Sequence, residues 1–160
     1  MDQNLKGEQL QSPEKEQAKL NILVVDDEPD IGTLMERFIG ISTVASQVGL
    51  IEMVVDGQEA WDILEKNKGK FNVVLTDGQM PKMGGLELAK KIKASGEGIV
   101  VGLMSANMNA LGLSDTKTQA SVMRDYGIAA VLPKPFNRQQ ISEFMGKIKD
   151  IREAKNSAAS

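Results

Sequence analysis

The feature that most constrains the fold of this chain is a set of short segments that are apolar almost without alternation. They are Asn21 to Val25, Leu50 to Val55, Phe71 to Thr76, Ile99 to Met104 and Ile128 to Leu132. Continuous apolar runs of this length are typical of strands buried on both faces of a parallel sheet. The segments between them are long enough for crossover helices, which predicts repeated βαβ units and an α/β fold.

Helical spacing of apolar residues marks the connecting segments. The predicted helices start near Pro29, after Asp56-Gly57, after Gly84-Gly85 and near Asn137. The first is predicted to continue to about Val48. From Asn107 to Asp125 we expect a long loop and then a helix that starts near Ser114-Asp115. On the helix after Gly85, the outward lysines Lys90, Lys91 and Lys93 are predicted to form a solvated face.

Composition narrows the class of protein. The chain has 160 residues, 41% of them hydrophobic, which suits one compact domain with a core of its own. A formal net charge of -3 gives no broad electrostatic reason to bind nucleic acid or a membrane, so protein partners are expected. The absence of cysteine excludes disulfides and thiolate metal sites and favours a cytoplasmic location. The absence of histidine excludes a phosphohistidine carried by the chain itself.

The two ends of the sequence are polar. Residues 1–20 contain no long apolar run, so neither a secretory signal nor a membrane anchor is predicted there. We expect them to form a poorly ordered extension. Residues 21–155 are then the folded domain, and residues 156–160 are predicted to fray.

Polar side chains follow the predicted strands where each strand ends. They are Asp26, Asp27 and Glu28 after the first strand, Asp77 after the third, Ser105 after the fourth and Lys134 after the fifth. The carboxyl ends of parallel strands meet in one crevice, which is where ligands bind in open α/β sheets. Several carboxylates brought close together resist ionisation unless a cation compensates them. Mg²⁺, a hard ion that prefers oxygen ligands, suits such a site.

These residues lie in motifs that resemble the receiver domains of two-component response regulators. The motifs are LVVDDEP, VVLTDGQMPKMGGLEL, GLMSA and LPKPF, and the similarity runs from about Asn21 to Ile151. The resemblance implies a flavodoxin-like receiver fold, with a five-stranded parallel sheet of order 2-1-3-4-5 and helices on both faces. It also implies a role in two-component or phosphorelay signal transduction.

By the same resemblance, Asp77 is the phosphoacceptor, and its product would be an acyl phosphate. The donor would be a histidine kinase, a histidine phosphotransfer protein or a small phosphodonor. Mg²⁺ would be bound by Asp27, Asp77 and the backbone carbonyl of Gln79, with Asp26 acting mainly through a metal-bound water.

The resemblance also assigns the groups around the phosphoryl oxygens. Lys134 would supply a positive charge to them. Pro135 stands where the family has a cis peptide bond that aims the lysine into the pocket. Ser105 would hydrogen-bond the phosphoryl group and draw the following loop inward. Pro81, in the loop after the acceptor, would have a structural role.

The chain departs from the family pattern in two places. Val131 occupies a position, three residues before the lysine, where the family often has Tyr or Phe that turns inward on activation, so an aromatic switch is not expected here. The connection from Ser105 to Lys134 is also longer than in the family, and the first helix-to-strand region is long as well. Gly78 and Asn107 flank the acceptor and would affect access of water to it.

Two other functions remain open at this stage. An aspartate-nucleophile phosphatase uses similar carboxylate and Mg²⁺ chemistry, but the chain has neither a cap domain nor an Asp-x-Asp pair after the first strand. A receiver-like domain that binds partners without phosphate would keep the fold but would not need the acidic pair. We therefore expect no enzymatic activity beyond self-phosphorylation and self-dephosphorylation, in a single-domain regulator or a receiver excised from a longer protein.

Overall fold

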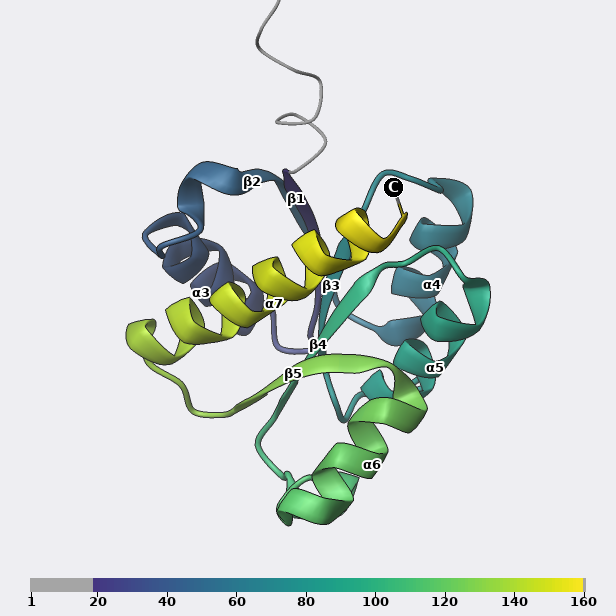
Figure 1. The fold of residues 1–160 in the computed structure, drawn as a ribbon. Helices are drawn as coiled ribbons and strands as arrows, with labels where there is room; N and C mark the ends of the chain where they lie inside the picture. The colour runs from purple at the N-terminus through teal and green to yellow at the C-terminus, as the bar shows by residue number, and fades with distance from the viewer. Residues whose placement is uncertain (1–18, 160) are drawn as a thin grey trace, which may run out of the picture.

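A five-stranded parallel sheet forms the centre of the molecule in the computed structural model, which describes residues 19–159 (Figure 1). Its strands are β1 (Leu20–Val25), β2 (Val48–Val54), β3 (Val73–Asp77), β4 (Val100–Ser105) and β5 (Ile128–Pro133). Their order is β2-β1-β3-β4-β5, and every neighbouring pair is parallel. The predicted fold class and strand order are confirmed.

Five α-helices connect and cover the strands. They are α3 (Pro29–Gly40), α4 (Gly57–Lys66), α5 (Gly85–Ser95), α6 (Thr116–Tyr126) and α7 (Arg138–Ala159), with short 3-10 helices η1 (Ala45–Gln47) and η2 (Asn109–Leu111). Side chains of α3 and α7 share one buried cluster with the sheet, and those of α4, α5 and α6 share the other. The sheet is therefore covered on both faces, as predicted.

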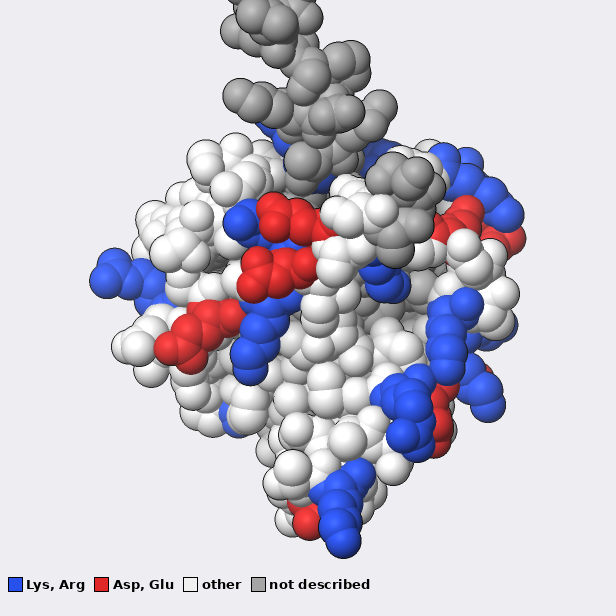
Figure 2. Space-filling model, in the orientation of Figure 1, with Lys and Arg blue, Asp and Glu red and all other residues white. Residues whose placement is uncertain are grey.

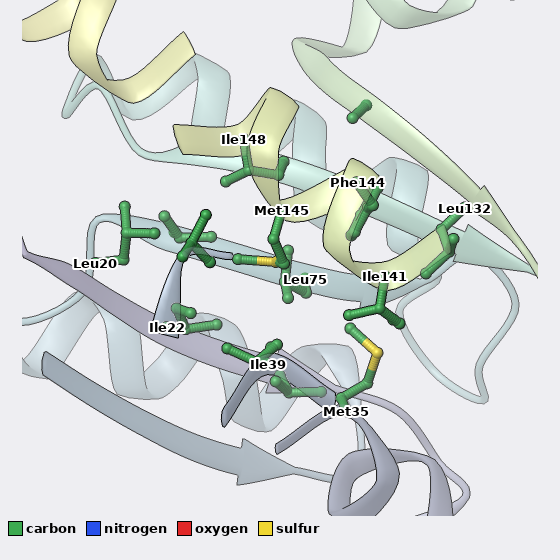
Figure 3. Packing of buried hydrophobic residues seen from close by; sticks show 14 of the residues in the cluster. Leu20, Ile22, Met35, Ile39, Leu75, Leu132, Ile141, Phe144, Met145 and Ile148 are labelled. Carbon is green, nitrogen blue, oxygen red and sulfur yellow. The ribbon is translucent and has the colours of Figure 1, made fainter. Parts of the chain in front are cut away.

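The α3 and α7 face holds the largest buried side chains of the last helix. Figure 3 shows the apolar stripe of α7 lying against side chains from β1, β3 and β5 and from α3. The stripe consists of Ile141, Phe144, Met145 and Ile148, each at most 3% exposed. On the surface of the same face, acidic and basic side chains are interspersed along α7 (Figure 2), so this helix presents no uniform charge.

The strand β2 lies at one edge of the sheet and is less buried than the central strands. All of β3 and β4 is buried, whereas most of β2 is partly or fully exposed. Met53 and, just after the strand, Val55 are 44% and 47% exposed. Glu52 forms an ion pair of 2.7 Å with Lys70 on this edge. The prediction of burial on both faces is therefore wrong for β2, in which only Val54 is buried.

Capping residues explain where three of the five helices begin. Asp56 accepts a hydrogen bond from the Glu59 N–H at the start of α4, and Asp115 accepts one from Thr118 at the start of α6. Before α7, Asn137 and Gln140 exchange side-chain to backbone hydrogen bonds of 2.8 Å. The predicted starts of these helices near Asp56-Gly57, Ser114-Asp115 and Asn137 are therefore confirmed.

The predicted end of the first helix was wrong. The first helix ends at Gly40 and not near Val48, because the Ser42 hydroxyl donates to the Ile39 carbonyl and also accepts from the Val44 N–H, which closes the last turn. The last helix continues to Ala159, and the fraying expected of residues 156–160 stays a prediction. Residues 1–18, most of the predicted extension, and Ser160 lie outside the described residues. Leu20, the last residue of that extension, is the first residue of β1 and is buried.

The lysines of α5 are exposed, as predicted, but they do more than face solvent. The Nζ of Lys91 lies 5.4 Å from the ring centroid of Trp61 on α4, and that of Lys90 lies 6.0 Å from the ring of Tyr126 on α6. Lys93 donates hydrogen bonds of 3.0 and 3.2 Å to the carbonyls of Arg124 and Asp125 at the end of α6. The lysines thus connect α5 with both neighbouring helices. Among residues 19–159, no helix is long and apolar enough to cross a membrane.

Candidate functional site

Three carboxylates meet where the central strands end. Asp26 and Asp27 follow β1, and Asp77 is the last residue of β3, the neighbouring strand. One carboxylate oxygen from each of the three lies within 4.8 Å of the others. Asp26 and Asp77 are 3% and 6% exposed, whereas Asp27 is open to solvent. The sheet topology therefore brings together the three acids that the sequence predicted as one cluster.

Lys134 joins the cluster from the edge strand β5. Its N–H donates to the Ser105 carbonyl at 2.8 Å, which fixes the start of its side chain beside the end of β4. Its Nζ lies 2.7 Å from Oδ2 of Asp26 and 3.6 Å from Oδ2 of Asp77. The bond between Lys134 and Pro135 is cis, as the family resemblance implied. The lysine thus contacts both buried acids and is closer to Asp26.

Backbone contacts hold the acids in place. The Glu28 N–H donates to Oδ1 of Asp26 at 2.9 Å. Directly after Asp77, the Gly78 N–H donates to the Met104 carbonyl at 2.8 Å, and the Gly78 carbonyl accepts from Gly85 at 3.0 Å. At Gly85, a β-carbon would collide with the carbonyl oxygen of Asp77, so only glycine allows this approach. The acceptor position is therefore tied to β4 and to the start of α5.

Burial and the neighbouring charges shift the ionisation of these groups. The pKa of Asp77 is raised to about 6, mainly by burial and also by the charge of Asp26, while Lys134 and the Gln79 N–H oppose the rise. The pKa of Asp26 is also raised by burial, although its hydrogen bond with Lys134 lowers it. For Lys134, burial lowers the pKa, but the bond to Asp26 and the nearby acids outweigh it, so the net shift is upward. The lysine is therefore a fixed positive charge at neutral pH.

Ser105 lies at the end of β4 and is 1% exposed. Its Oγ accepts a hydrogen bond of 3.0 Å from the Asn107 N–H, and its O–H proton is left to donate elsewhere. Pro81 lies in the loop between β3 and α5, where its carbonyl accepts from the Met83 N–H at 2.9 Å. Thus Ser105 is at the predicted edge of the sheet, and Pro81 is in the loop that follows the acceptor.

The carboxylates fit a magnesium site by their chemistry. Mg²⁺ prefers oxygen ligands and commonly takes one or two carboxylates together with water. Here, two buried acids and one exposed acid face each other with a single lysine among them, which leaves their negative charge only partly compensated. This uncompensated charge is what a divalent cation would neutralise.

The response regulator receiver domain model matches residues 22–145 of this sequence. The chain belongs to that family. Its receiver domain is 30% identical over 136 residues to a chemotaxis protein CheY homolog of Campylobacter jejuni, covering 82% of this chain and 92% of that protein. It is 29% identical over 117 residues to the response regulator RppA of a Synechocystis strain, covering 73% of this chain and 45% of RppA. This chain thus spans less than half the length of RppA.

Solved structures support the fold of the receiver domain. A response regulator receiver domain protein from Clostridium thermocellum superposes with a TM-score of 0.66 at 24% identity, covering 87% of this chain and 98% of that one. The chemotaxis response regulator CheY4 of Vibrio cholerae gives 0.64 at 20% identity, covering 81% and 98%. At these identities the similarity concerns the fold.

Two features of the receiver domain's site were not predicted from the sequence. The carboxylate of Glu28 lies 3.7 Å from Lys134, although no role was assigned to it. Lys82, in the loop after the acceptor, has a left-handed φ of 68°, which side-chain-bearing residues seldom adopt. A glycine or asparagine would have indicated that conformation, but the residue here is lysine.

Proposed function

We propose that this receiver domain accepts a phosphoryl group on Asp77 and changes conformation to control a protein partner. The observation that carries the proposal is the surroundings of Asp77. Asp77 is 6% exposed, its carboxylate has an oxygen within 4.8 Å of two other carboxylates, and it is 3.6 Å from the Lys134 ammonium. A buried acid beside other acids is costly, and perturbed groups of this kind are concentrated at functional sites.

In the proposed reaction, a carboxylate oxygen of Asp77 attacks the phosphorus of the donor. The new P–O bond forms as the P–N bond of a phosphohistidine, or the P–O bond of acetyl phosphate, breaks. The electron pair leaves with the imidazole or the acetate, and the product is an acyl phosphate. With a pKa of about 6, Asp77 is mostly ionised at neutral pH and has the lone pair that the attack requires.

The other residues assist without forming bonds to phosphorus. Lys134 places its ammonium beside the acceptor, where charge builds up on the transferring oxygens. Ser105 can donate its free hydroxyl proton to a phosphoryl oxygen while it still accepts from Asn107. Asp26 holds Lys134 at 2.7 Å. In this proposal, Lys134 and Ser105 bind the phosphoryl group, and Asp26 orients Lys134.

The same acids would hold Mg²⁺: Asp27 and Asp77 directly, together with the backbone carbonyl of Gln79, and Asp26 mainly through a bound water. The ion supplies positive charge to the phosphoryl oxygens. Pro81 and Pro135 have structural roles in this proposal, because they shape the loops that carry Gln79 and Lys134.

The proposed donor is a histidine kinase or a histidine phosphotransfer protein in the cytoplasm. The chain has no histidine of its own, so the phosphohistidine must come from a partner. Receiver domains are signalling domains, and the proposal gives this one no activity beyond transfer to its own Asp77 and hydrolysis of the product. Residues 21–155 are proposed to be sufficient for it.

A mass measurement tests the proposal. The protein is incubated with acetyl phosphate and Mg²⁺, and intact mass is compared for wild type, Asp77→Asn and the control Asp62→Asn, which changes an exposed acid on α4. We expect one base-labile phosphoryl group on wild type and on the control, lost on removal of Mg²⁺, and none on Asp77→Asn. If neither acetyl phosphate nor a phosphohistidine protein modifies wild type, the domain binds partners without phosphate.

A further inference from the structure

The inward face of α7 changes from apolar to cationic before the helix ends. Ile148 is the last buried residue in the described part of α7, and it shares an apolar cluster with Leu20, the first residue of β1. Helical intervals of four and three residues continue the same face from Ile148 to Arg152 and Lys155. These two cations therefore lie where α7 leaves the core, at the end of the sheet where the strands begin (Figure 1).

Arg152 differs from the other partly buried cations because it has no counterion. In the described part of the chain, the partly buried cations are Lys134, Lys149 and Arg152. The Nζ of Lys134 lies 2.7 Å from Asp26, and that of Lys149 lies 3.5 Å from Glu153. Arg152 has no such carboxylate among the described residues, and its Nε is buried without a hydrogen-bond partner. A buried donor without an acceptor is rare and unfavourable.

Lys155 adds a second positive charge beside Arg152. Lys155 is more exposed than Arg152, yet burial lowers its pKa, and the nearby charge of Arg152 lowers it as well. Burial also lowers the pKa of Arg152. No carboxylate of the described residues opposes either shift. The two cations are thus close enough to repel each other, and an anion bound between them would remove that repulsion.

The end of α7 explains the cations only in part. The last carbonyls of a helix carry partial negative charge, which favours positive side chains nearby. That attraction gives the Nε–H of Arg152 no acceptor, because this atom is buried and unbonded. Among the described residues, the other buried side-chain polar atom without a partner is Oε1 of Gln47, and it is not bonded to Arg152 either. The acceptor for Arg152 must therefore come from elsewhere.

We propose that Arg152 and Lys155 bind the phosphate group of a small ligand, at the end of the sheet opposite Asp77. An arginine guanidinium presents its N–H groups in a planar fork that matches phosphate oxygens, and a lysine adds a point charge. Two positive charges suit a phosphate monoester, which is mostly dianionic at neutral pH. In the complex, the Nε–H of Arg152 and the ammonium of Lys155 both donate to phosphate oxygens.

The charges on the outer side of α7 favour a small ligand over a charged surface. Asp150 and Glu153 are exposed on the same turns of the helix, and acidic side chains are visible along it in Figure 2. An anionic membrane or a nucleic acid that approached α7 would be repelled by these acids. A small phosphate-bearing molecule can reach the inward side without contacting them.

A titration followed by NMR tests the site. Sodium phosphate or glycerol 3-phosphate is added to the full chain at constant ionic strength and without Mg²⁺, with sodium chloride as the reference. The Nε–H signal of Arg152 and the backbone amides of α7 are followed. The variants are Arg152→Gln and Lys155→Gln, with two controls. Lys147→Gln changes an exposed lysine of the same helix, and Asp77→Asn removes the proposed phosphoacceptor.

In wild type we expect both phosphate compounds to cause saturable shifts of the Arg152 Nε–H, and chloride to cause none. Lys155→Gln should weaken binding by about tenfold, as loss of one hydrogen bond to a charged group predicts. Arg152→Gln should abolish the shifts of the α7 amides. Lys147→Gln and Asp77→Asn should bind phosphate as wild type does, so the result is independent of the proposed function.

The wild-type titration can overturn the inference even if a variant fails to fold. If phosphate causes no saturable shift of the Arg152 Nε–H, or if chloride causes the same shift, there is no phosphate site. Shifts of the α7 amides that persist in Arg152→Gln and Lys155→Gln would mean that phosphate binds elsewhere. Binding to vesicles that contain phosphatidylglycerol, without binding of free phosphate, would also contradict the proposal, because the cations would then face a membrane.

The acids of the chain's own amino-terminal residues provide a last test. Glu14 and Glu16 lie outside the described residues and precede Leu20 by only a few positions. The double variant Glu14→Gln, Glu16→Gln should leave the Arg152 Nε–H signal unchanged when no phosphate is present. A shift of that signal would show that these glutamates are the partners of Arg152, and the site would not be open to a ligand.

Discussion

The helices α6 and α7 cover opposite faces of the sheet and are held by different kinds of interaction. In α7, four large apolar side chains are at most 3% exposed, and each buried side chain of this size contributes about 1.5–3 kcal/mol. No residue of α6 is buried: its Val122, Met123 and Tyr126 pack only partly buried against the other cluster, and its ends are held by the Asp115 cap and by Lys93. Single contacts of that kind contribute about 1 kcal/mol or less. The helix α7 is thus held on the sheet by much more buried apolar surface than α6, so α6 can be displaced at a lower cost in free energy.

The largest expected effect tests the fixed side of this comparison. Phe144→Ala should lower the free energy of unfolding by about 3–5 kcal/mol, because the ring is 3% exposed and packs over Gly102 of β4, leaving a cavity when it is removed. Urea denaturation followed by circular dichroism measures the change. Val122→Ala, a truncation on α6, should cost about 1 kcal/mol or less. If Phe144→Ala and Val122→Ala lower the free energy of unfolding equally, α6 is held as firmly as α7 and the contrast between the two helices is wrong.

A second test concerns the acceptor pocket, where burial of the charged Asp77 carboxylate lowers the free energy of unfolding. Without divalent ions, Asp77→Asn should raise the free energy of unfolding at pH 7.5 by roughly 1–3 kcal/mol, because it removes a buried charge. The folded pKa of about 6 lies above the usual 3.8, so the folded state binds more protons between these values. The contribution of Asp77 to stability therefore falls as pH rises from about 4 to 6, and the full cost is present above that range.

Denaturation at several pH values checks this prediction. The difference between Asp77→Asn and wild type should be smallest near pH 4 and should reach its full size above pH 6. Asp150→Asn, which changes an exposed acid of α7, should alter stability by less than about 0.5 kcal/mol throughout. A difference between Asp77→Asn and wild type that does not depend on pH would show that the charge of Asp77 is not the cause.

A smaller gain is expected in the loop after the acceptor. Lys82 has a left-handed φ of 68°, which costs about 1 kcal/mol for a residue with a β-carbon. Lys82→Gly should therefore stabilise the protein by about 0.5–1 kcal/mol, measured as a rise in the urea midpoint. The same change at Lys90, inside α5, should have the opposite sign and a similar size. If both variants destabilise the protein, the Lys82 side chain makes a contact that stabilises the fold by more than its left-handed backbone costs.

The smallest effect concerns the weakly held helix itself. Lys93→Gln should destabilise the protein by about 0.5 kcal/mol, because it removes a positive charge from the carbonyls at the end of α6. Hydrogen exchange of the α6 amides should quicken, while exchange in α7 should not change. As a control, Lys68→Gln replaces an exposed lysine in the turn after α4 and should leave α6 exchange as in wild type. Faster exchange in both helices would show that they unfold as one unit.

The fold could be predicted from the sequence because its main signals are local. Apolar runs and capping residues determine where elements begin, and parallel topology then places Asp26, Asp77 and Lys134 at one edge of the sheet. The end of α3 was missed because helical spacing continues past Gly40, and only the Ser42 hydrogen bonds show that the last turn closes there.

What the sequence could not supply are contacts between segments that are distant in the chain. The closeness of Lys134 to Asp26 and the position of Leu111 on Gly78 depend on how loops pack after the strands have aligned. The lysines of α5 show the same limit. Their outward position follows from helical spacing, but their partners on α4 and α6 depend on the distance between helices.

The edge strand β2 has a consequence for solubility at high concentration. Within residues 19–159, no strand pairs with its outer backbone groups, and Met53 and Val55 are exposed beside them. This is the kind of surface on which chains stack through their sheets. Glu52 and Lys70 place a pair of charges on this edge. High salt, which screens both charges, weakens that protection. Aggregation of the folded protein is then expected to begin at β2.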